Sequence, residues 1–166
     1  MSSLLASATI SLTLMLAGCA GMTSRPEFKW QTLANRATAE LKVGPVYVDE
    51  RSSLKGGRYY CREMRLELGL AGNNPRLVLA HELAHHVLRH CGESYTQEIA
   101  ANALAVTVLE IWGETPSKAA YLMPRFIYGN RAAPVLSVHD SCAELKDFLR
   151  QYPTAPDPRK AGECGA

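Results

Sequence analysis

The residues with the clearest chemistry are His81-Glu82-Leu83-Ala84-His85, which form an HExxH pattern. Residues four apart in a helix lie one turn apart on the same face, so both imidazoles can reach one zinc ion. Glu82 follows the first histidine and can approach a water molecule at that ion. Burying two histidines and a glutamate on an apolar helix is costly unless a ligand compensates. The pattern therefore predicts a zinc site with Glu82 as the catalytic base.

A third ligand is expected on the next helix. Catalytic zinc takes three protein ligands and keeps a fourth position open for water. Glu98 opens the run Glu98-Ile99-Ala100-Ala101-Asn102, and an antiparallel helix pair would bring it back to the histidines. Asn102 lies one turn further on the same face and can hold the second nitrogen of a ligand histidine. Only twelve residues separate His85 from Glu98, so Glu98 falls in the first turn of its helix.

Both patterns resemble those of the gluzincin metallopeptidases, in which an HExxH helix is followed by a helix with an ExxA(D/N) run. The similarity covers about Val46 to Trp112. It extends to the smallest single-domain members, the minigluzincins, and to bacterial peptidases of the Ste-type and ImmA-like groups. This resemblance implies Zn²⁺ bound by His81, His85 and Glu98, with Glu82 as general base.

The resemblance also implies where a substrate would bind. In gluzincins a strand that precedes the active-site helix lines the cleft and pairs with an extended peptide. The segment 58–68 would take that part here, with Tyr60, Met64 and Leu66 as the expected substrate-strand residues.

Other histidines and two tyrosines are candidates for further roles. The family has a His or Tyr donor that stabilises the oxyanion, and His139 is the first candidate, followed by Tyr95 and Tyr121. His86 points about a hundred degrees away from the preceding histidine around the helix, so it cannot share the metal and is expected to pack or to support the site. His90 is expected to cap the exposed carbonyls at the helix end rather than to bind metal.

The N-terminal residues have the pattern of a secretion signal. Leu4 to Ala17 contains no charge and is too short to span a bilayer, so residues 1–18 are expected to be a signal peptide. The run Leu16-Ala17-Gly18-Cys19 resembles the lipobox of bacterial lipoproteins, which implies that Cys19 becomes the lipid-modified N-terminus. Ala20 then implies, for a Gram-negative host, an outer-membrane anchor facing the periplasm. The expected location is the cell envelope, attached through lipid rather than a spanning helix.

The cysteines fit this location. Beyond Cys19 there remain four, an even number that favours two disulfides in an oxidising compartment, with three possible pairings. Cys91 is expected to be disulfide-bonded or buried rather than a zinc ligand, and Cys164 is the first candidate for an unpaired thiol. The four are Cys61, Cys91, Cys142 and Cys164.

The composition excludes other classes of protein. The 166 residues are 47% apolar and 20% charged, which fits one globular domain and excludes a disordered chain. The 18 basic and 16 acidic residues are balanced and the basic ones are scattered, so we expect no nucleic-acid binding. The sequence carries no signal for the oligomeric state.

The remaining patterning predicts an α+β fold. A short antiparallel-type sheet, from runs at 46–48 and 58–68, is expected to pack on the HExxH helix and the second glutamate helix, with further C-terminal helices. Asn73 or Asn74 would cap the HExxH helix, with Pro75 at its first position, and Ser94 or Thr96 would cap the second. The expected segments are a signal peptide (1–18), a tether and short helix (19–42), the metallopeptidase domain (43–152) and a flexible tail (153–166).

These patterns lead to one main hypothesis of function: a zinc endopeptidase that cleaves extended or unfolded polypeptide in the cell envelope. Its partners would be the polypeptide substrate and the membrane, reached through the N-terminal lipid. One alternative is a non-catalytic binding or assembly lipoprotein that keeps zinc as a structural element. Another is a domain held together by disulfides, without metal.

Overall fold

The computed structural model describes residues 29–72, 74–92, 94–129 and 141–159. The predicted signal peptide, Cys19, His139 and Cys164 lie outside these residues. The described elements, in order, are α1 (Lys29–Glu40), β1 (Tyr47–Arg51), β2 (Gly57–Tyr60), β3 (Arg65–Gly69), α2 (Pro75–Val87), α3 (Tyr95–Ile111), α4 (Pro116–Gly129) and α5 (Ser141–Gln151).

Local signals set the starts of the two central helices. The Asn74 side chain accepts a hydrogen bond from the backbone N–H of Leu77 at 3.3 Å, and Pro75 follows as the first helical residue of α2. Ser94 does the same for the N–H of Gln97 at the start of α3. The predicted caps are therefore confirmed, with Asn74 chosen over Asn73 and Ser94 over Thr96.

The three strands form a mixed sheet, so the α+β class is confirmed but the expected antiparallel arrangement is wrong. The strand order is β1-β3-β2, with β1 parallel to β3 and β2 antiparallel to it. The segment 58–68 is two strands, because the chain reverses between Cys61 and Met64, where Met64 takes a left-handed φ of 46°. The third strand then inserts between the first two. The alternation of side chains along a strand does not reveal which strands become its neighbours.

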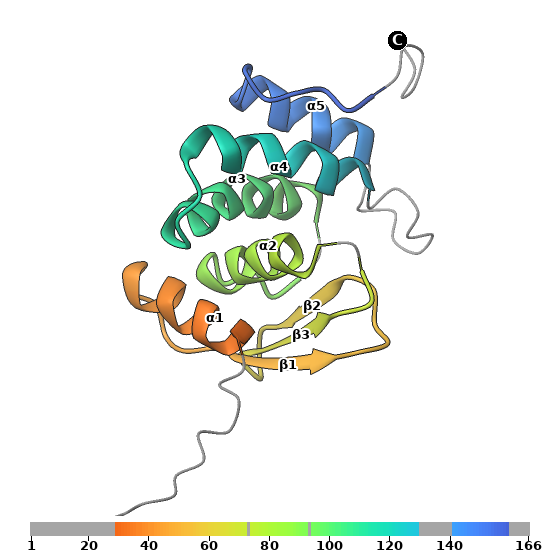
Figure 1. The fold of residues 1–166 in the computed structure, drawn as a ribbon. Helices are drawn as coiled ribbons and strands as arrows, with labels where there is room; N and C mark the ends of the chain where they lie inside the picture. The colour runs from red at the N-terminus through yellow and green to blue at the C-terminus, as the bar shows by residue number, and fades with distance from the viewer. Residues whose placement is uncertain (1–28, 73, 93, 130–140, 160–166) are drawn as a thin grey trace, which may run out of the picture.

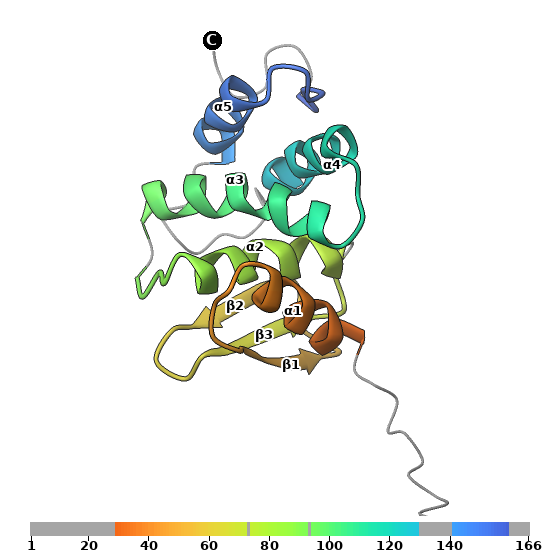
Figure 2. The ribbon, with the colours of Figure 1, turned by 90° about the vertical axis from the view of Figure 1, so that its left-hand side faces the viewer.

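The elements are stacked. Figures 1 and 2 show the sheet and α1 at one end, followed by α2, then α3 and α4, with α5 at the far end. Helix α2 contacts β2 and β3 on one side and α3 on the other. Gln31 ties α1 to the sheet, because its side chain donates to the Val46 carbonyl at 2.9 Å and accepts from the Val48 N–H at 2.8 Å. In the part of the chain described here, none of the helices is sufficiently long and apolar to cross a membrane.

Three cysteines of the described residues are disulfide-bonded. Cys61, at the end of β2, is bonded to Cys91, just beyond α2, which confirms that Cys91 is a disulfide cysteine. Cys142 in α5 is also disulfide-bonded. The first bridge holds the segment after the HExxH helix against the turn between β2 and β3.

Candidate metal centre

The site is built on α2, which is central because almost its whole circumference is covered. Its Leu and Ala side chains pack on the sheet and on α3, and His81, His85 and His86 are buried among them. A histidine in such a helix needs a partner for each polar ring nitrogen, since an unpaired buried polar group costs about 1–3 kcal/mol. The partners of these nitrogens therefore define what each histidine does.

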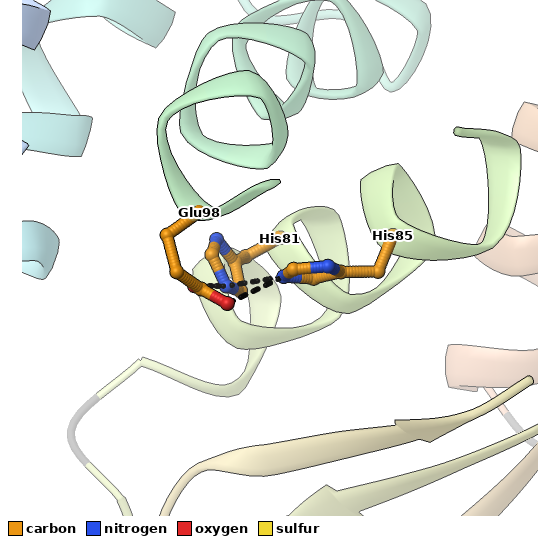
Figure 3. A group of neighbouring side chains, drawn as sticks. All are labelled: His81, His85 and Glu98. Carbon is orange, nitrogen blue, oxygen red and sulfur yellow. Dashed lines mark hydrogen bonds and ion pairs between the residues drawn. The ribbon is translucent and has the colours of Figure 1, made fainter. Parts of the chain in front are cut away.

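Three side chains from two helices converge on one point (Figure 3). The Nε2 atoms of His81 and His85 lie 3.1 Å apart. Glu98, in the first turn of α3, places Oε2 at 3.1 Å from Nε2 of His81 and Oε1 at 3.5 Å from Nε2 of His85. The ligand atoms of the three residues all lie within 4.8 Å of one another, and all three residues are buried. The group can hold a metal ion, and the short connection before Glu98 does not prevent it.

Asn102 orients the first histidine. Its Oδ1 lies 3.0 Å from Nδ1 of His81, while its Nδ2 donates to Oε2 of Glu144 in α5 at 3.2 Å. The bond to Glu144 fixes the orientation of the amide, so the oxygen faces His81. Because this oxygen only accepts, Nδ1 carries the proton and Nε2 of His81 is directed at the cluster.

His90 takes the corresponding place beside the second histidine. Nδ1 of His85 and Nδ1 of His90 are 3.0 Å apart. The expectation that the His90 side chain caps the end of α2 is wrong, because its ring contacts another ring nitrogen instead of a helix carbonyl. Burial lowers the pKa of His90, and the electrostatic interaction with His85 lowers it further.

The side chains of the cluster shift one another's pKa values. Burial by itself would lower the pKa of His81, but the hydrogen bond to Glu98 and the charges of Glu82, Glu98 and Glu144 outweigh it, and the pKa is raised. Burial would raise the pKa of Glu98, but its bonds to both histidines hold that pKa far below the usual range. Glu98 is therefore a carboxylate at neutral pH, as a metal ligand must be.

Glu82 lies between the cluster and the sheet. Its carboxylate lies beside the backbone of Tyr59 in β2, and burial raises its pKa although His81, His85 and the Tyr59 backbone act to lower it. A Cβ atom at Gly57 would come within 2.8 Å of Cγ of Glu82 and 2.6 Å of Cγ1 of Val78. Glycine is therefore required for β2 to approach α2 this closely.

The expected substrate-strand residues need correction. Leu66 lies on the central strand β3, which is paired on both sides, and is fully buried, so neither its backbone nor its side chain is available to a peptide. Met64 lies in the turn and is 52% exposed. Tyr60 lies on β2, but its hydroxyl donates to Glu67 at 3.0 Å and Arg65 lies over its ring. Leu66 and Met64 are thus not edge-strand residues, and the Tyr60 side chain already contacts its own sheet.

The tyrosines named as oxyanion donors differ in their surroundings. The Tyr95 hydroxyl donates to Asp147 of α5 at 2.8 Å, whereas Tyr121 is largely exposed on α4. His86 is placed away from the cluster, as expected. Its Nε2 donates to the carbonyl of Gly44 at 2.8 Å, so its Nδ1 accepts from the Tyr59 hydroxyl at 3.0 Å.

Two neighbours of the ligands carry no signal in the sequence patterns discussed above. Phe126 of α4 lies beside the ring of His81, with ring centroids 5.5 Å apart. Glu144 reaches Asn102 from α5. Both belong to elements far from the HExxH run in sequence, so only the packing of α4 and α5 brings them to the site.

Comparisons of the chain with protein-family models, with curated proteins and with solved structures gave no match.

Proposed function

We propose that this chain is a zinc-dependent endopeptidase that hydrolyses extended or unfolded polypeptide in the cell envelope. The observation that carries the proposal is the convergence of His81, His85 and Glu98, with Glu82 at the adjacent position of the same helix. Two imidazoles and one carboxylate are a ligand set of catalytic zinc sites, which keep one position open.

The ligand spacing supports zinc as the metal. Zinc bonds to nitrogen and oxygen of 2.0–2.1 Å in a tetrahedron separate neighbouring ligand atoms by about 3.3 Å. The two Nε2 atoms lie 3.1 Å apart, Oε2 of Glu98 lies 3.1 Å from Nε2 of His81, and the other oxygen of Glu98, Oε1, lies 3.5 Å from Nε2 of His85. With one ligand atom from each residue, the three atoms all lie within 4.8 Å of one another. The bonds from Asn102 and His90 leave the Nε2 atoms for the metal, which is the arrangement that favours binding by neutral histidine.

Glu82 is the residue that would move the proton. When bound, zinc supplies Lewis-acid activation of water and of the scissile carbonyl. The carboxylate of Glu82 would take the proton from the attacking water and pass it to the departing amine nitrogen. The raised pKa of Glu82 brings it closer to the working pH, which suits a group that both accepts and donates a proton.

The edge strand β2 supports a peptide as the substrate. It is one outer strand of the sheet, and its pairing with β3 directs the main-chain groups of Gly57 and Tyr59 away from β3. The backbone of β2 at Gly57 and Tyr59 lies beside Glu82, so this edge lies next to the proposed catalytic base. A peptide added along β2 would therefore present its backbone to the metal centre. This replaces the predicted role of Met64 and Leu66.

The decisive experiment compares the purified chain with its Glu82→Gln variant. We expect wild type to bind one zinc ion and to cleave an unfolded protein such as reduced casein. Glu82→Gln should keep the zinc but lose more than about 99% of the activity, since it removes the general base and leaves the ligands. Glu40→Gln, on the exposed side of α1, is the matched control and should behave as wild type.

The outcomes separate the competing hypotheses. A fully active Glu82→Gln variant would refute the role of Glu82. Stoichiometric zinc without cleavage of any unfolded substrate would favour the non-catalytic lipoprotein. A chain that folds in chelator and takes up no zinc would favour the disulfide-held domain without metal.

The envelope location rests on the N-terminal sequence and is tested separately. The run ending at Cys19 supports lipid attachment at that residue. We expect the wild-type chain to incorporate labelled palmitate and to sediment with outer membranes, and Cys19→Ser to do neither. Labelling of Cys19→Ser at the wild-type level would contradict attachment there.

A further inference from the structure

The last turn of α2 ends in a backbone arrangement that places residue 90 beside residue 85. Arg89 has a left-handed φ of 54°. Its N–H donates to the carbonyl of His86 at 3.1 Å, and the N–H of His90 donates to the carbonyl of His85 at 3.0 Å. These two bonds define the Schellman motif, in which the second residue after the cap contacts the third residue before it. That contact is usually apolar, but here both residues are histidines.

The side chains of this pair are hydrogen-bonded as well. The two Nδ1 atoms are 3.0 Å apart, and the ring centroids are 5.1 Å apart with the planes at 69°. One Nδ1 must donate and the other must accept, because a neutral imidazole carries a single proton. If Nε2 of His85 binds metal, the proton of His85 lies on Nδ1. His90 must then accept at Nδ1 and carry its own proton on Nε2.

We propose that His90 is a positioning residue, which holds the ring of His85 in the orientation and tautomer that direct Nε2 at the metal. The inference rests on the proposed zinc site. It gives the two ligand histidines equivalent support from different sources: an amide oxygen of α3 for His81 and an imidazole from the end of α2 for His85. Groups in this position typically change metal affinity by about 10- to 100-fold.

The surroundings hold His90 in this place. The next residue, Cys91, is bonded to Cys61 at the end of β2, so the chain after α2 is fixed to the sheet on one side of His90. On the other side, the backbone bond to His85 fixes it to the helix. A side chain held from both sides loses little freedom when it bonds to His85, which suits it to orient a ligand.

The test uses three variants of the full chain. They separate the loss of the hydrogen-bond acceptor at residue 90 from a change in how that side chain packs. His90→Leu keeps an apolar contact that the Schellman motif favours but removes the acceptor. His90→Asn places an amide oxygen close to the position of Nδ1. Arg89→Gly is the matched control, because glycine suits the left-handed φ. Zinc affinity is measured by competition with a chromophoric chelator, and thermal unfolding of each metal-free chain reports the fold.

We expect His90→Leu to weaken zinc binding by about 10- to 100-fold, His90→Asn to recover it to within about threefold of wild type, and Arg89→Gly to leave it unchanged. A purely structural role would not distinguish Asn from Leu in this way. Wild-type affinity in a folded His90→Leu variant overturns the inference while leaving the zinc site intact. A wild-type chain that binds no zinc overturns the proposed function, and this inference with it.

A measurement on the unaltered chain decides the matter if His90→Leu does not fold. Nitrogen-15 NMR of the zinc-loaded protein identifies the protonated nitrogen of each imidazole. We expect the proton on Nδ1 of His85 and on Nε2 of His90. A proton on Nδ1 of His90, or a second zinc ion bound by His90, overturns the proposed role.

Discussion

The two sides of α2 use the same residue type for different purposes. On the side facing α3, His81 and His85 join Glu98 in the candidate metal cluster. On the side facing the sheet, His86 is just as buried but bonds to the Tyr59 hydroxyl and the Gly44 carbonyl. His85 and His86 are neighbours in sequence, so the difference arises from what each ring meets in space.

The partners of the ring nitrogens explain this difference. Both ring nitrogens of His86 are hydrogen-bonded to protein groups, so this side chain connects α2 to β2 and to the segment before β1 and leaves no nitrogen for a metal. His81 and His85 each have Nδ1 paired, to Asn102 and His90, and both direct Nε2 at a common point. One ring nitrogen held by a protein group and the other directed at further ligand-type atoms is the arrangement expected of a metal-binding histidine. The two sides should therefore respond differently to the same substitution.

The largest contrast is expected between His85→Gln and His86→Gln. His85→Gln removes a ligand, so we expect zinc affinity to fall by more than about 100-fold, beyond the effect of an outer partner. His86→Gln should keep affinity within about threefold, since its ring points away from the cluster. Elemental analysis measures the zinc content of the two variants, and competition with a chelator measures their zinc affinity. Equal losses in the two variants would mean that the two sides are not distinct.

The Cys61–Cys91 disulfide links the sheet to the segment after α2 that carries His90, and its removal is expected to have the next effect. The bridge spans 30 residues, and chain entropy gives it about 3–4 kcal/mol of stabilisation. We expect the Cys61→Ala/Cys91→Ala variant to unfold at lower urea concentration and to bind zinc more weakly, because the segment that carries His90 is released. An unchanged urea midpoint would show that the bridge does not constrain the fold.

Smaller effects are expected from substitutions that remove the hydrogen bonds of His86 to the sheet side of α2. His86→Phe leaves the Tyr59 hydroxyl and the Gly44 carbonyl without their partner, which should lower the free energy of unfolding by about 1–3 kcal/mol. Tyr59→Phe removes only one of these bonds, and we expect about 1 kcal/mol. Urea unfolding of both variants and of the Tyr59→Phe/His86→Phe double variant measures the coupling between the two side chains. Strict additivity would argue against a direct bond.

The smallest effect is the pH dependence of the metal-free chain. The pKa of His81 is raised above 6.5, so its contribution to stability is present below that pH and is lost as pH rises through the higher value. The pKa of Glu98 is lowered from 4.5, so its contribution is present above that pH and is lost in strong acid. We expect the unfolding temperature of the metal-free chain to be highest between these pH values and to fall by a few degrees above them.

Zinc provides the control for this prediction. Because zinc replaces the histidine protons, its stabilisation of the fold should grow as pH rises from 5 to 8. Thermal unfolding with and without zinc at each pH measures the difference. A metal-free chain whose stability rises steadily to pH 8 would contradict the pKa direction of His81.

Much of the site follows from short-range patterns, because a helix fixes the relative positions of residues within a turn or two. The spacing of His81 and His85, the caps at Asn74 and Ser94, and the relation of Glu98 to Asn102 are all of this kind. Even the contact between His85 and His90 could have been inferred from a helix with Leu88 as its C-cap and a left-handed residue after it. The sequence patterns suggested capping by His90 because they did not specify the left-handed backbone conformation of Arg89.

Contacts between distant segments could not be read in the same way. Strand alternation is the same for parallel and antiparallel partners, so it did not reveal that β3 inserts between β1 and β2 or that Leu66 is internal. The pairing of Cys61 with Cys91 was one of three possibilities with the same cysteine count. Local order along the chain was enough to propose the ligands, whereas only the packed fold assigned His86 to the sheet and β2 to the edge, because those roles depend on atoms brought together from separate elements.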